Sequence, residues 1–193
     1  MRARLLAAAE TVFAKKGYEG TRIADIAEVA GCSVGAVYFR FKDKDALFFA
    51  IAESFAADAR ERLAALLEGS AAHDPREIVR EFVARSAANY RAHKGLFRAI
   101  VERGFDHPRA MDTVFNFRDE MAAALERSLR VHLKGKRAEG LTLAVRVTTQ
   151  MIYGFLLTGV LNAKAPTRID DPRSVEEATA AITAYLDAKG FLG

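Results

Sequence analysis

Apolar residues recur every three or four positions along almost the whole chain, which is the spacing of amphipathic α-helices. No stretch alternates apolar and polar residues over a useful length, as a half-buried β-strand would. We therefore predict an all-α protein with about nine helices and no strands. The predicted helices cover residues 2–16, 23–30, 34–41, 44–67, 75–93, 95–103, 109–133, 141–161 and 174–189.

The segment from Thr21 to Lys44 has the pattern of two short helices joined by a tight turn. Thr21 is placed to cap the first helix, Gly31 can adopt the left-handed conformation that ends it, and Ser33 can cap the second. Helix, short glycine-containing turn and helix form the helix-turn-helix pattern, in which the second helix enters the DNA major groove. This segment is the strongest functional indication in the sequence.

The helix over residues 2–16 completes a compact unit of three helices with the two helices of this segment. So small a unit is marginal alone, and we expect it to lean on the long helix that follows. We predict a DNA-binding domain over residues 1–46 and a second helical domain over residues 47–193. The expected core of the first consists of Leu5, Ala9, Phe13, Ile23, Ile26, Ala27, Val37, Tyr38 and Phe41.

Composition narrows the class of protein further. A hydrophobic content of 51% in 193 residues is ample for a packed core. Cys32 is the single cysteine, which excludes an intrachain disulfide and a cysteine-based zinc site. The most apolar run, residues 151–163, is shorter than the roughly 20 residues that cross a bilayer. With no secretory pattern at its start, the chain is expected to stay in the cytoplasm.

The formal net charge of +4 suits an anionic partner, and its distribution is uneven. Residues 1–44 hold eight basic against five acidic side chains, whereas the rest of the chain holds 21 against 20. Most of the positive excess therefore lies in and around the predicted helix-turn-helix.

This part of the chain resembles the DNA-binding domain of tetracycline-repressor (TetR) family transcriptional regulators. The resemblance covers roughly residues 5 to 50; beyond residue 55 it lies only in length and helix count. It implies a homodimer that represses transcription until a small molecule binds its C-terminal domain. The positions that carry it are Phe13, Gly17-Tyr18, Ile26-Ala27, Ala30-Gly31-x-Ser33, Tyr38-x-x-Phe41-x-x-Lys44 and Leu47.

The resemblance implies a set of DNA contacts, in which Tyr38 and Lys44 would bind the phosphate backbone. Val34, Gly35 and Ala36 carry no polar side chain and could only contact thymine methyl groups or let the DNA approach closely. Plain helix capping is the alternative role for threonine and serine in this set, and a solvated charge for arginine and lysine. The full set is Thr21, Arg22, Ser33, Val34, Gly35, Ala36, Tyr38, Phe39, Arg40, Lys42 and Lys44.

Apolar and aromatic residues are dense in the middle helices, where the resemblance implies an effector pocket. Spacing alone cannot separate a pocket wall from a packed core, so core packing is the alternative for each of them. The candidate pocket residues are Phe82, Tyr90, Phe97, Val101, Phe105, Met111, Phe115, Arg118, Met121, Gln150 and Tyr153.

The last two predicted helices carry more apolar surface than a monomer's outer layer needs, and could form a four-helix bundle across a two-fold axis. The alternative is that one of the two stripes only covers its own domain. The candidate interface residues are Leu143, Val147, Met151, Gly154, Leu157, Leu161, Val175, Ala178, Ile182, Tyr185 and Leu186.

The sequence shows no catalytic motif, phosphate-binding glycine loop or paired histidines at metal-ligand spacing, so we expect neither an enzyme nor a metal or cofactor site. We predict a ligand-responsive repressor that binds double-stranded DNA at a palindromic operator, with itself and a small apolar or amphipathic effector as further partners and no membrane. The alternative is a constitutive DNA-binding or protein-interaction module of the same fold without an effector.

Overall fold

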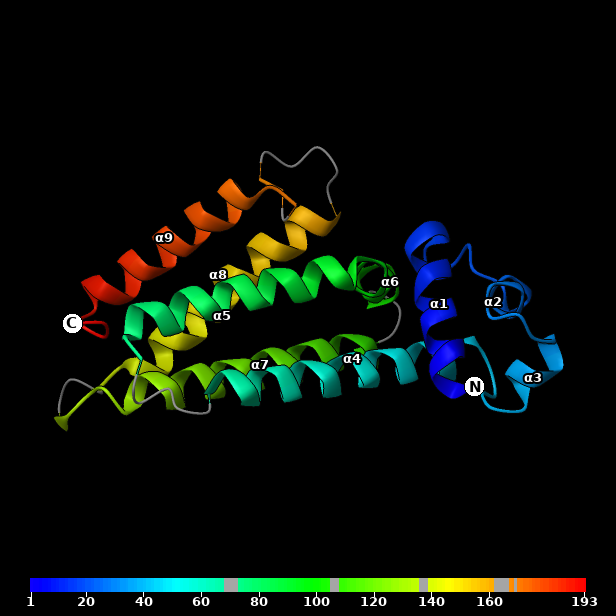
Figure 1. The fold of residues 1–193 in the computed structure, drawn as a ribbon, viewed down its shortest axis with the longest axis horizontal. Coiled ribbons are helices and arrows are strands. Elements are labelled where there is room, and N and C mark those ends of the chain that lie inside the picture. Colours follow the sequence, from blue (N-terminus) through cyan, green and yellow to red (C-terminus); the bar gives the residue numbers. More distant parts are fainter. Residues whose placement is uncertain (68–72, 105–107, 136–138, 162–166, 169) are drawn as a thin grey trace. The chain divides into compact units, whose positions relative to one another are not determined.

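The computed structural model describes residues 1–67, 73–104, 108–135, 139–161, 167–168 and 170–193, which form nine α-helices and no strand (Figure 1). The prediction of an all-α fold is thereby confirmed. The helices are α1 (Arg2–Lys16), α2 (Ile23–Val29), α3 (Val34–Tyr38), α4 (Lys44–Leu67), α5 (Pro75–Ala92), α6 (Lys94–Gly104), α7 (Pro108–Arg130), α8 (Leu141–Leu161) and α9 (Pro172–Ala188).

The helices gather into two compact units. The first unit comprises Met1–Asp58 and His93–Val114, and the second comprises Ala59–Ala92 and Phe115–Gly193. Helices α4 and α7 each contribute residues to both units, so two continuous helices join them. The predicted functional boundary after residue 46 falls inside α4 and stays a prediction.

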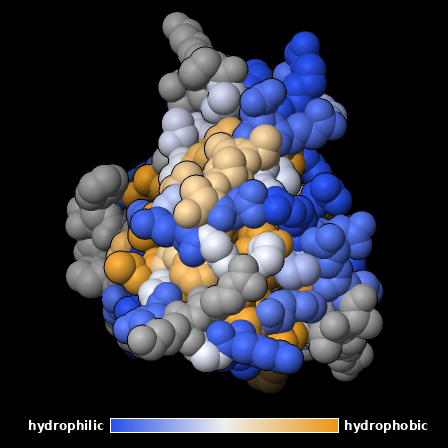
Figure 2. Space-filling view, turned by 90° about the vertical axis from the view of Figure 1, so that its left-hand side faces the viewer, coloured by the Kyte–Doolittle hydropathy of each residue, from blue (hydrophilic) through white to orange (hydrophobic). Residues whose placement is uncertain are grey.

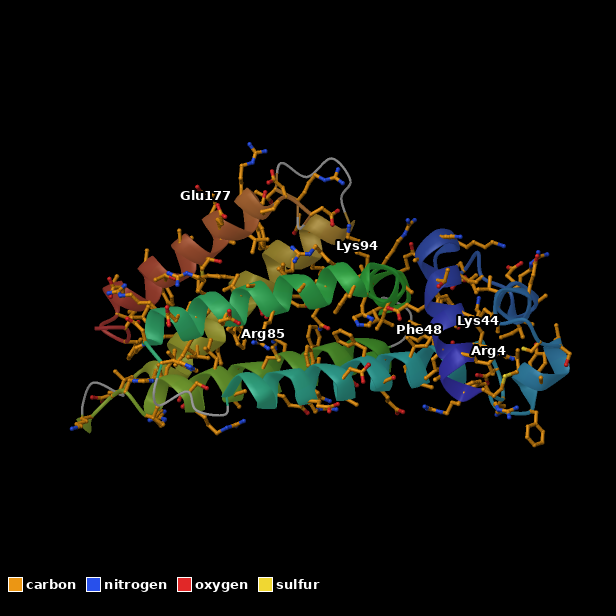
Figure 3. The ribbon with its side chains drawn as sticks, viewed as in Figure 1. Arg4, Lys44, Phe48, Arg85, Lys94 and Glu177 are labelled. Carbon is orange, nitrogen blue, oxygen red and sulfur yellow. The ribbon has the colours of Figure 1, made fainter. Side chains whose placement is uncertain are left out.

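Aromatic rings form the centre of the first unit. The ring of Tyr18 stacks on Phe13 at 5.7 Å and meets the edge of Phe48 at 5.3 Å, while Phe13 and Phe48 pack edge to face at 5.9 Å. Phe13 and Phe48 are fully buried. This cluster joins α1 to the second turn of α4, where Phe48 lies (Figure 3). The long helix therefore supports the three N-terminal helices, as their small size predicted.

Helix α6 packs directly on α1 within the first unit. Gly95 lies so close to Ala14 that an added Cβ would overlap the backbone and side chain of Ala14. Beside this contact, Glu10 Oε1 lies 2.6 Å from His93 Nδ1, and Glu102 accepts a 3.0 Å hydrogen bond from the backbone N–H of Tyr18. Residues 93–104 are therefore part of the same compact unit as the helix-turn-helix.

In the second unit, α5 packs against both α8 and α9, and α8 packs against α9 (Figure 1). Apolar side chains such as Val79, Leu125 and Leu156 are completely buried there. At the surface, Arg76 on α5 forms an ion pair with Asp187 on α9 at 2.6 Å. A second ion pair, between Arg60 and Glu120, joins α4 to α7. Figure 2 shows apolar patches interrupted by charged side chains on the face that it presents.

Several predicted helix ends are confirmed by their hydrogen bonds. Gly17 ends α1 with a positive φ of 69°, and its N–H donates to the carbonyl of Phe13. Asp43 accepts a 2.7 Å bond from the N–H of Ala46, and Asp74 accepts one of the same length from Arg76. At these two helices, an aspartate before the first turn therefore marks where the helix begins.

Two predicted caps are wrong because a neighbouring group takes the role. The N-cap of α2 is Arg22, whose own N–H donates to the Asp25 carboxylate, rather than Thr21. Helix α9 begins at Pro172 with Asp171 as its N-cap, rather than at Ser174. Aspartate followed by proline at the first helical position starts this helix two residues before the predicted start at Ser174.

The predicted core of the first unit is largely buried, with one clear exception. Tyr38 is 53% exposed, although it was expected inside, and Ile23 is only partly buried. Val37 and Phe41 are the residues of this segment that face the interior. Since Tyr38 follows Val37 by about 100° around the helix axis, burying one of them turns the other outward.

Among the helices longer than ten residues, α8 is the most apolar. Residues Leu141–Gly159 have a mean hydropathy of 1.2, and by length and composition alone this stretch could cross a membrane. Yet 44% of it is buried inside the protein, and the core helices of soluble proteins share these properties. Its apolar character is therefore explained by packing on one side and by an exposed stripe described below.

Candidate nucleic-acid interface

The turn between α2 and α3 is a Schellman motif. The N–H of Cys32 donates to the carbonyl of Ala27 at 3.0 Å, and the N–H of Gly31 donates to that of Glu28 at the same distance. Gly31 has a φ of 61°, a conformation that strongly favours glycine. The predicted role of Gly31 is confirmed, and the motif sets the direction in which α3 leaves α2.

Ser33 caps the next helix, as predicted. Its Oγ accepts a 3.1 Å hydrogen bond from the N–H of Ala36. Helix α3 covers only Val34–Tyr38, shorter than the predicted 34–41, because Phe39 and Arg40 already form a turn. The predicted recognition helix therefore consists of little more than one turn followed by a tight bend into α4.

The two sides of α3 differ sharply. Val37 is completely buried and Phe41 is 6% exposed, so these two side chains fasten the segment to the core. On the other side, Val34 is 40%, Tyr38 53% and Phe39 85% exposed. The outward surface of this segment, which we call the α3 face, is mostly apolar and consists of Val34, Gly35, Ala36, Tyr38 and Phe39.

Two cations border the α3 face. The guanidinium of Arg40 lies 5.6 Å from the ring centre of Phe39, which is a cation–π distance. Lys42 follows on the surface and is exposed. The predicted DNA-contact residues 33–42 are therefore solvent-accessible, apart from the partly buried Ala36 and the buried Val37 and Phe41 between them.

Lys44 has a role in the fold that the sequence did not reveal. Its ammonium group donates to the carbonyl of Tyr18 at 2.9 Å and to that of Thr21 at 3.1 Å (Figure 3). It also lies 4.2 Å from the ring centre of Tyr18. Two of its three N–H donors are thus used inside the protein, and one is left for a phosphate.

Thr21 is placed differently from the prediction. Its side chain is only 2% exposed, and its hydroxyl donates a 2.6 Å hydrogen bond to the carbonyl of Gly17. It therefore does not cap α2, and its predicted contact with DNA stays a prediction. Instead, it closes the loop between α1 and α2, and the only signal for this in the sequence is its spacing of four residues from Gly17.

Arg22 belongs to a charged cluster at the start of α2. Its guanidinium lies 3.1 Å from the carboxylate of Asp25, and Lys16 approaches the same carboxylate at 3.0 Å. Hydrogen bonds from Arg22 and Lys16 hold the pKa of Asp25 well below its usual range. Arg22 remains exposed, but part of its positive charge is balanced by Asp25 before any DNA approaches.

The predicted pocket residues are divided between the two units. Phe82, Tyr90 and Tyr153 are buried in the second unit, whereas Phe115 and Gln150 are exposed there. Phe97 and Val101 lie in the first unit, on α6, and Phe97 packs on Phe55 with ring centres 5.0 Å apart. Phe105 and Met111 lie outside the residues whose side chains the structure describes.

Arg118 joins several of these residues in the second unit. Its guanidinium donates to Gln150 Oε1 at 2.9 Å and lies 5.1 Å from the ring centre of Phe115. Burial raises the pKa of both Tyr90 and Tyr153, and the charge of Arg118 opposes that rise. Met121 is partly buried on the same helix. In this cluster, predicted pocket residues from α5, α7 and α8 interact.

Two buried polar atoms of the second unit were not foreseen. Among the described residues, Asn89 Oδ1 on α5 and Thr148 Oγ1 on α8 are buried without a hydrogen-bond partner. An unmet buried acceptor costs about 1–3 kcal/mol, so such atoms mark places that a ligand or water completes. Nothing in the sequence distinguishes these two residues from other polar residues on a helix.

The predicted dimer residues whose side chains the structure describes fall into three groups by exposure. Leu143 is 68%, Val147 36% and Met151 41% exposed, and together they form a stripe along α8. Gly154, Leu157, Val175, Ala178 and Tyr185 are partly exposed. Ile182 and Leu186 are buried within the chain itself, which accounts for their apolar side chains without a partner. Leu161 lies outside the described side chains.

Helices α5 and α9 leave an open groove of about 570 Å³ between them, which the sequence did not predict. Its walls carry both charges, since Arg80 comes from α5 and Glu176 from α9. The remaining lining side chains are mostly small, among them Ala84, Thr179, Ala180, Thr183 and Ala184. Within the described part of the chain, no cluster of three metal-ligating side chains occurs.

An all-α fold whose N-terminal helices form a helix-turn-helix with an outward α3 face defines a helix-turn-helix transcriptional regulator. A profile described as bacterial regulatory proteins of the tetR family matches residues 5–51, and one described as the tetracyclin repressor-like C-terminal domain matches residues 74–186. The second match alone covers more than half of the chain. The protein therefore belongs to the TetR family of DNA-binding transcriptional regulators, which are not enzymes.

Relatives at the sequence level are similar over less than half of this chain. The chain is 31% identical over 91 residues to the transcriptional regulator YerO of Bacillus subtilis, covering 47% of this chain and 32% of YerO. It is 37% identical over 82 residues to the regulator TtgR of Pseudomonas putida, covering 42% and 39%. The chain thus matches only about a third to two-fifths of the length of these relatives.

Similarity in fold extends over the whole chain. The solved structure of a TetR transcription regulator from Haloarcula marismortui superposes with a TM-score of 0.76, covering 97% of this chain and 96% of that one at 17% identity. PfmR from Thermus thermophilus superposes with a TM-score of 0.65 at 24% identity, covering 95% and 97%. At such low identity the likeness supports the fold, and the chemistry must be argued from this chain's own residues.

Proposed function

We propose that the protein is a repressor that binds a palindromic operator as a homodimer and leaves it when a small apolar or amphipathic effector binds. The observation that carries the proposal is the α3 face, where Tyr38 and Phe39 are turned to solvent by the burial of Val37 and Phe41. Side chains that contribute nothing to the core are free to contact the edges of bases in the major groove.

Contacts to the phosphate backbone would come from the border of the α3 face. The hydroxyl of Tyr38 can donate to a phosphate, and the exposed cations of Arg40 and Lys42 lie in the same segment. Lys44 would add its third N–H, and Ser33 its hydroxyl proton. Because these contacts displace condensed counterions, affinity is expected to fall steeply with rising salt.

Dimerisation is supported by the exposed stripe of Leu143, Val147 and Met151 on α8. Three large apolar side chains in a row along one helix are costly in water, and a second copy of the same helix across a two-fold axis would cover them. Two α3 faces related by that axis would contact half-sites about one DNA turn apart, which makes a palindrome the expected operator.

Effector binding is supported by the polar atoms buried in the second unit. Asn89 Oδ1 and Thr148 Oγ1 are ready to accept hydrogen bonds, and Arg118 reaches Gln150 at 2.9 Å among aromatic side chains. Such a mixture of apolar walls and a few polar groups is typical of small-molecule sites. Helices α4 and α7 run through both units and could carry a rearrangement of the second unit to the first.

Selection of bound sequences from random double-stranded DNA tests the DNA-binding part of the proposal. Enrichment of an inverted repeat is the expected result, and it would establish both the operator and the symmetry of the bound protein. A direct repeat or a single site would contradict the dimer, and no enrichment at all would contradict operator binding and favour a protein-interaction module.

The effector part needs a separate measurement. A compound library screened by thermal shift should yield small apolar or amphipathic molecules that raise the melting temperature. Each of them should weaken operator binding, and the operator should weaken compound binding by the same factor, because linkage is reciprocal. Stabilising compounds that leave operator affinity unchanged would contradict induction and favour a constitutive regulator.

A further inference from the structure

We propose that Phe39 recognises the 5-methyl group of a thymine in each operator half-site. The inference rests on the DNA-binding function proposed above and deepens it by naming the chemical group that is read. Phe39 is 85% exposed, the largest exposed fraction among the large apolar side chains that the structure describes. A phenyl ring so placed contributes almost nothing to the fold and is available for a partner.

The position of Phe39 follows from the anchors on either side of it. Val37 is completely buried and Phe41 is 6% exposed, so the backbone between them is fixed from two sides. Phe39 keeps right-handed helical dihedral angles, φ −61° and ψ −27°, and therefore continues the α3 face by one residue. Gly35 precedes it by four residues and Ala36 by three, which places all three on one side of the helix.

Gly35 leaves room beside the ring. A Cβ at that position would meet only Ser33 Oγ, at 3.8 Å, so the surface next to Phe39 is open. Arg40, the next residue in the chain, covers part of the Phe39 ring, with its guanidinium 5.6 Å from the ring centre. A cation at that distance restricts the ring, yet Phe39 remains 85% exposed.

The chemistry of the α3 face decides what it can read. Four of its five residues, Val34, Gly35, Ala36 and Phe39, have no side-chain hydrogen-bonding group. The hydroxyl protons of Tyr38 and Ser33 are assigned to phosphates above, and the Oγ of Ser33 already accepts a bond from Ala36. The apolar group that the bases present in the major groove is the thymine 5-methyl, because the other positions are donors and acceptors. A face of this composition distinguishes thymine from the other bases by burying that methyl group.

Replacement of thymine by deoxyuridine removes the methyl group and leaves every hydrogen-bonding group of the base in place. We expect one thymine in each half-site of the selected operator to be sensitive, with about fourfold weaker binding after its replacement. Thymines whose methyl groups do not meet Phe39 should tolerate deoxyuridine. Fluorescence anisotropy with duplexes substituted one thymine at a time gives these affinities.

Variants of Phe39 assign the sensitivity to this side chain. Phe39→Ala should bind the thymine and deoxyuridine operators equally well, whereas Phe39→Leu, which keeps an apolar contact, should still prefer thymine. Val131→Ala, an exposed valine in the second unit, serves as the control and should behave as the wild type. Melting curves should be unchanged throughout, because Phe39 is almost fully exposed.

The outcomes separate this inference from the function on which it rests. Tight operator binding with deoxyuridine tolerated at every position would overturn the methyl contact and leave the regulator intact. An undiminished thymine preference in Phe39→Ala would likewise overturn the assignment to Phe39. Absence of any selected operator would instead remove the DNA-binding function itself.

Discussion

The ammonium group of Lys44 lies 4.2 Å above the ring of Tyr18 and donates a 2.9 Å hydrogen bond to the carbonyl oxygen of the same residue. This single side chain joins the start of α4 to the loop that follows α1. A residue that family resemblance assigns to the DNA backbone thus also holds together the unit that carries the α3 face. Its replacement should affect both folding and DNA binding.

Lys44→Ala is expected to lower the free energy of unfolding by about 1.5–3 kcal/mol, because two backbone carbonyls lose a charged hydrogen-bond donor. It should also reduce the slope of log affinity against log salt by about one. Lys42→Ala, a change at an exposed lysine two residues away, should reduce the slope without changing stability. Urea denaturation and anisotropy titrations at several salt concentrations measure both effects.

Equal melting temperatures for wild type and Lys44→Ala would show that its two carbonyl contacts are unimportant in solution. An unchanged salt slope would remove Lys44 from the phosphate contacts.

Gly35→Ala is expected to weaken DNA binding without destabilising the fold, unlike Lys44→Ala. An added Cβ meets only Ser33 Oγ at 3.8 Å, and alanine favours a helix over glycine by up to about 1 kcal/mol, so the free protein should hold or gain stability. Operator affinity should nevertheless fall by about tenfold or more if DNA lies against this glycine, since an overlapping methyl group costs about 1–3 kcal/mol. Melting curves and anisotropy test the two halves.

Wild-type affinity in Gly35→Ala would show that DNA does not approach α3 at this residue. The expected stability of the free variant does not depend on that outcome.

Asp25 should make stability depend on pH in the acid range. Arg22 and Lys16 hold the pKa of its carboxyl below the unfolded value of about 3.9, so the unfolded state binds the proton more readily. The stabilisation is therefore present above about pH 4 and is lost as the pH falls towards the folded pKa. The melting temperature of wild type should exceed that of Asp25→Asn at pH 6, and the difference should shrink towards pH 3.

A constant difference between the two proteins across this pH range would contradict the ionised cluster. Asp43→Asn provides a matched control, because Asp43 is an exposed helix cap for which asparagine is an equally good substitute.

Leu143→Glu tests the proposed dimer. A charge at the most exposed position of the α8 stripe should convert the protein to monomers in sedimentation velocity runs at micromolar concentration, because burying an unpaired carboxylate between two copies is strongly unfavourable. Affinity for the full palindrome should fall with it. Val131→Glu, at a valine that is 58% exposed, is the control and should remain dimeric.

A monomeric wild type would contradict the dimer itself. A dimeric Leu143→Glu protein would place the interface elsewhere than on the α8 stripe.

Sequence reasoning succeeded where a single residue determines local structure. Gly31 ends α2 and Ser33 caps α3 because positive φ and a short hydroxyl side chain leave few alternatives. It missed contacts between segments that lie far apart in the chain. The hydrogen bonds of Lys44 to the carbonyls of Tyr18 and Thr21 were not predicted, because nothing local indicates that these carbonyls lie within reach of its ammonium group.

The second unit shows the same limit. Ile182 and Leu186 were grouped with exposed residues such as Leu143 by helical spacing, but packing buries the first two within the chain. The spacing of apolar residues shows that one side of a helix is apolar. It does not show whether the same chain or a second copy covers that side. The assignment of Phe97 and Val101 on α6 to the first unit likewise depends on tertiary contacts that carry no local signal.

The overlap that forbids a side chain at Gly95 also bears on how regulators of this kind can be recombined. Helix α6 is distant from α1 in the sequence, yet its backbone at Gly95 packs closely against Ala14 of α1. A hybrid that takes residues 1–46 from this protein and the remainder from another would place a foreign α6 against α1. Grafts that carry residues 93–104 together with the N-terminal helices should keep this contact and yield folded chimeras more often.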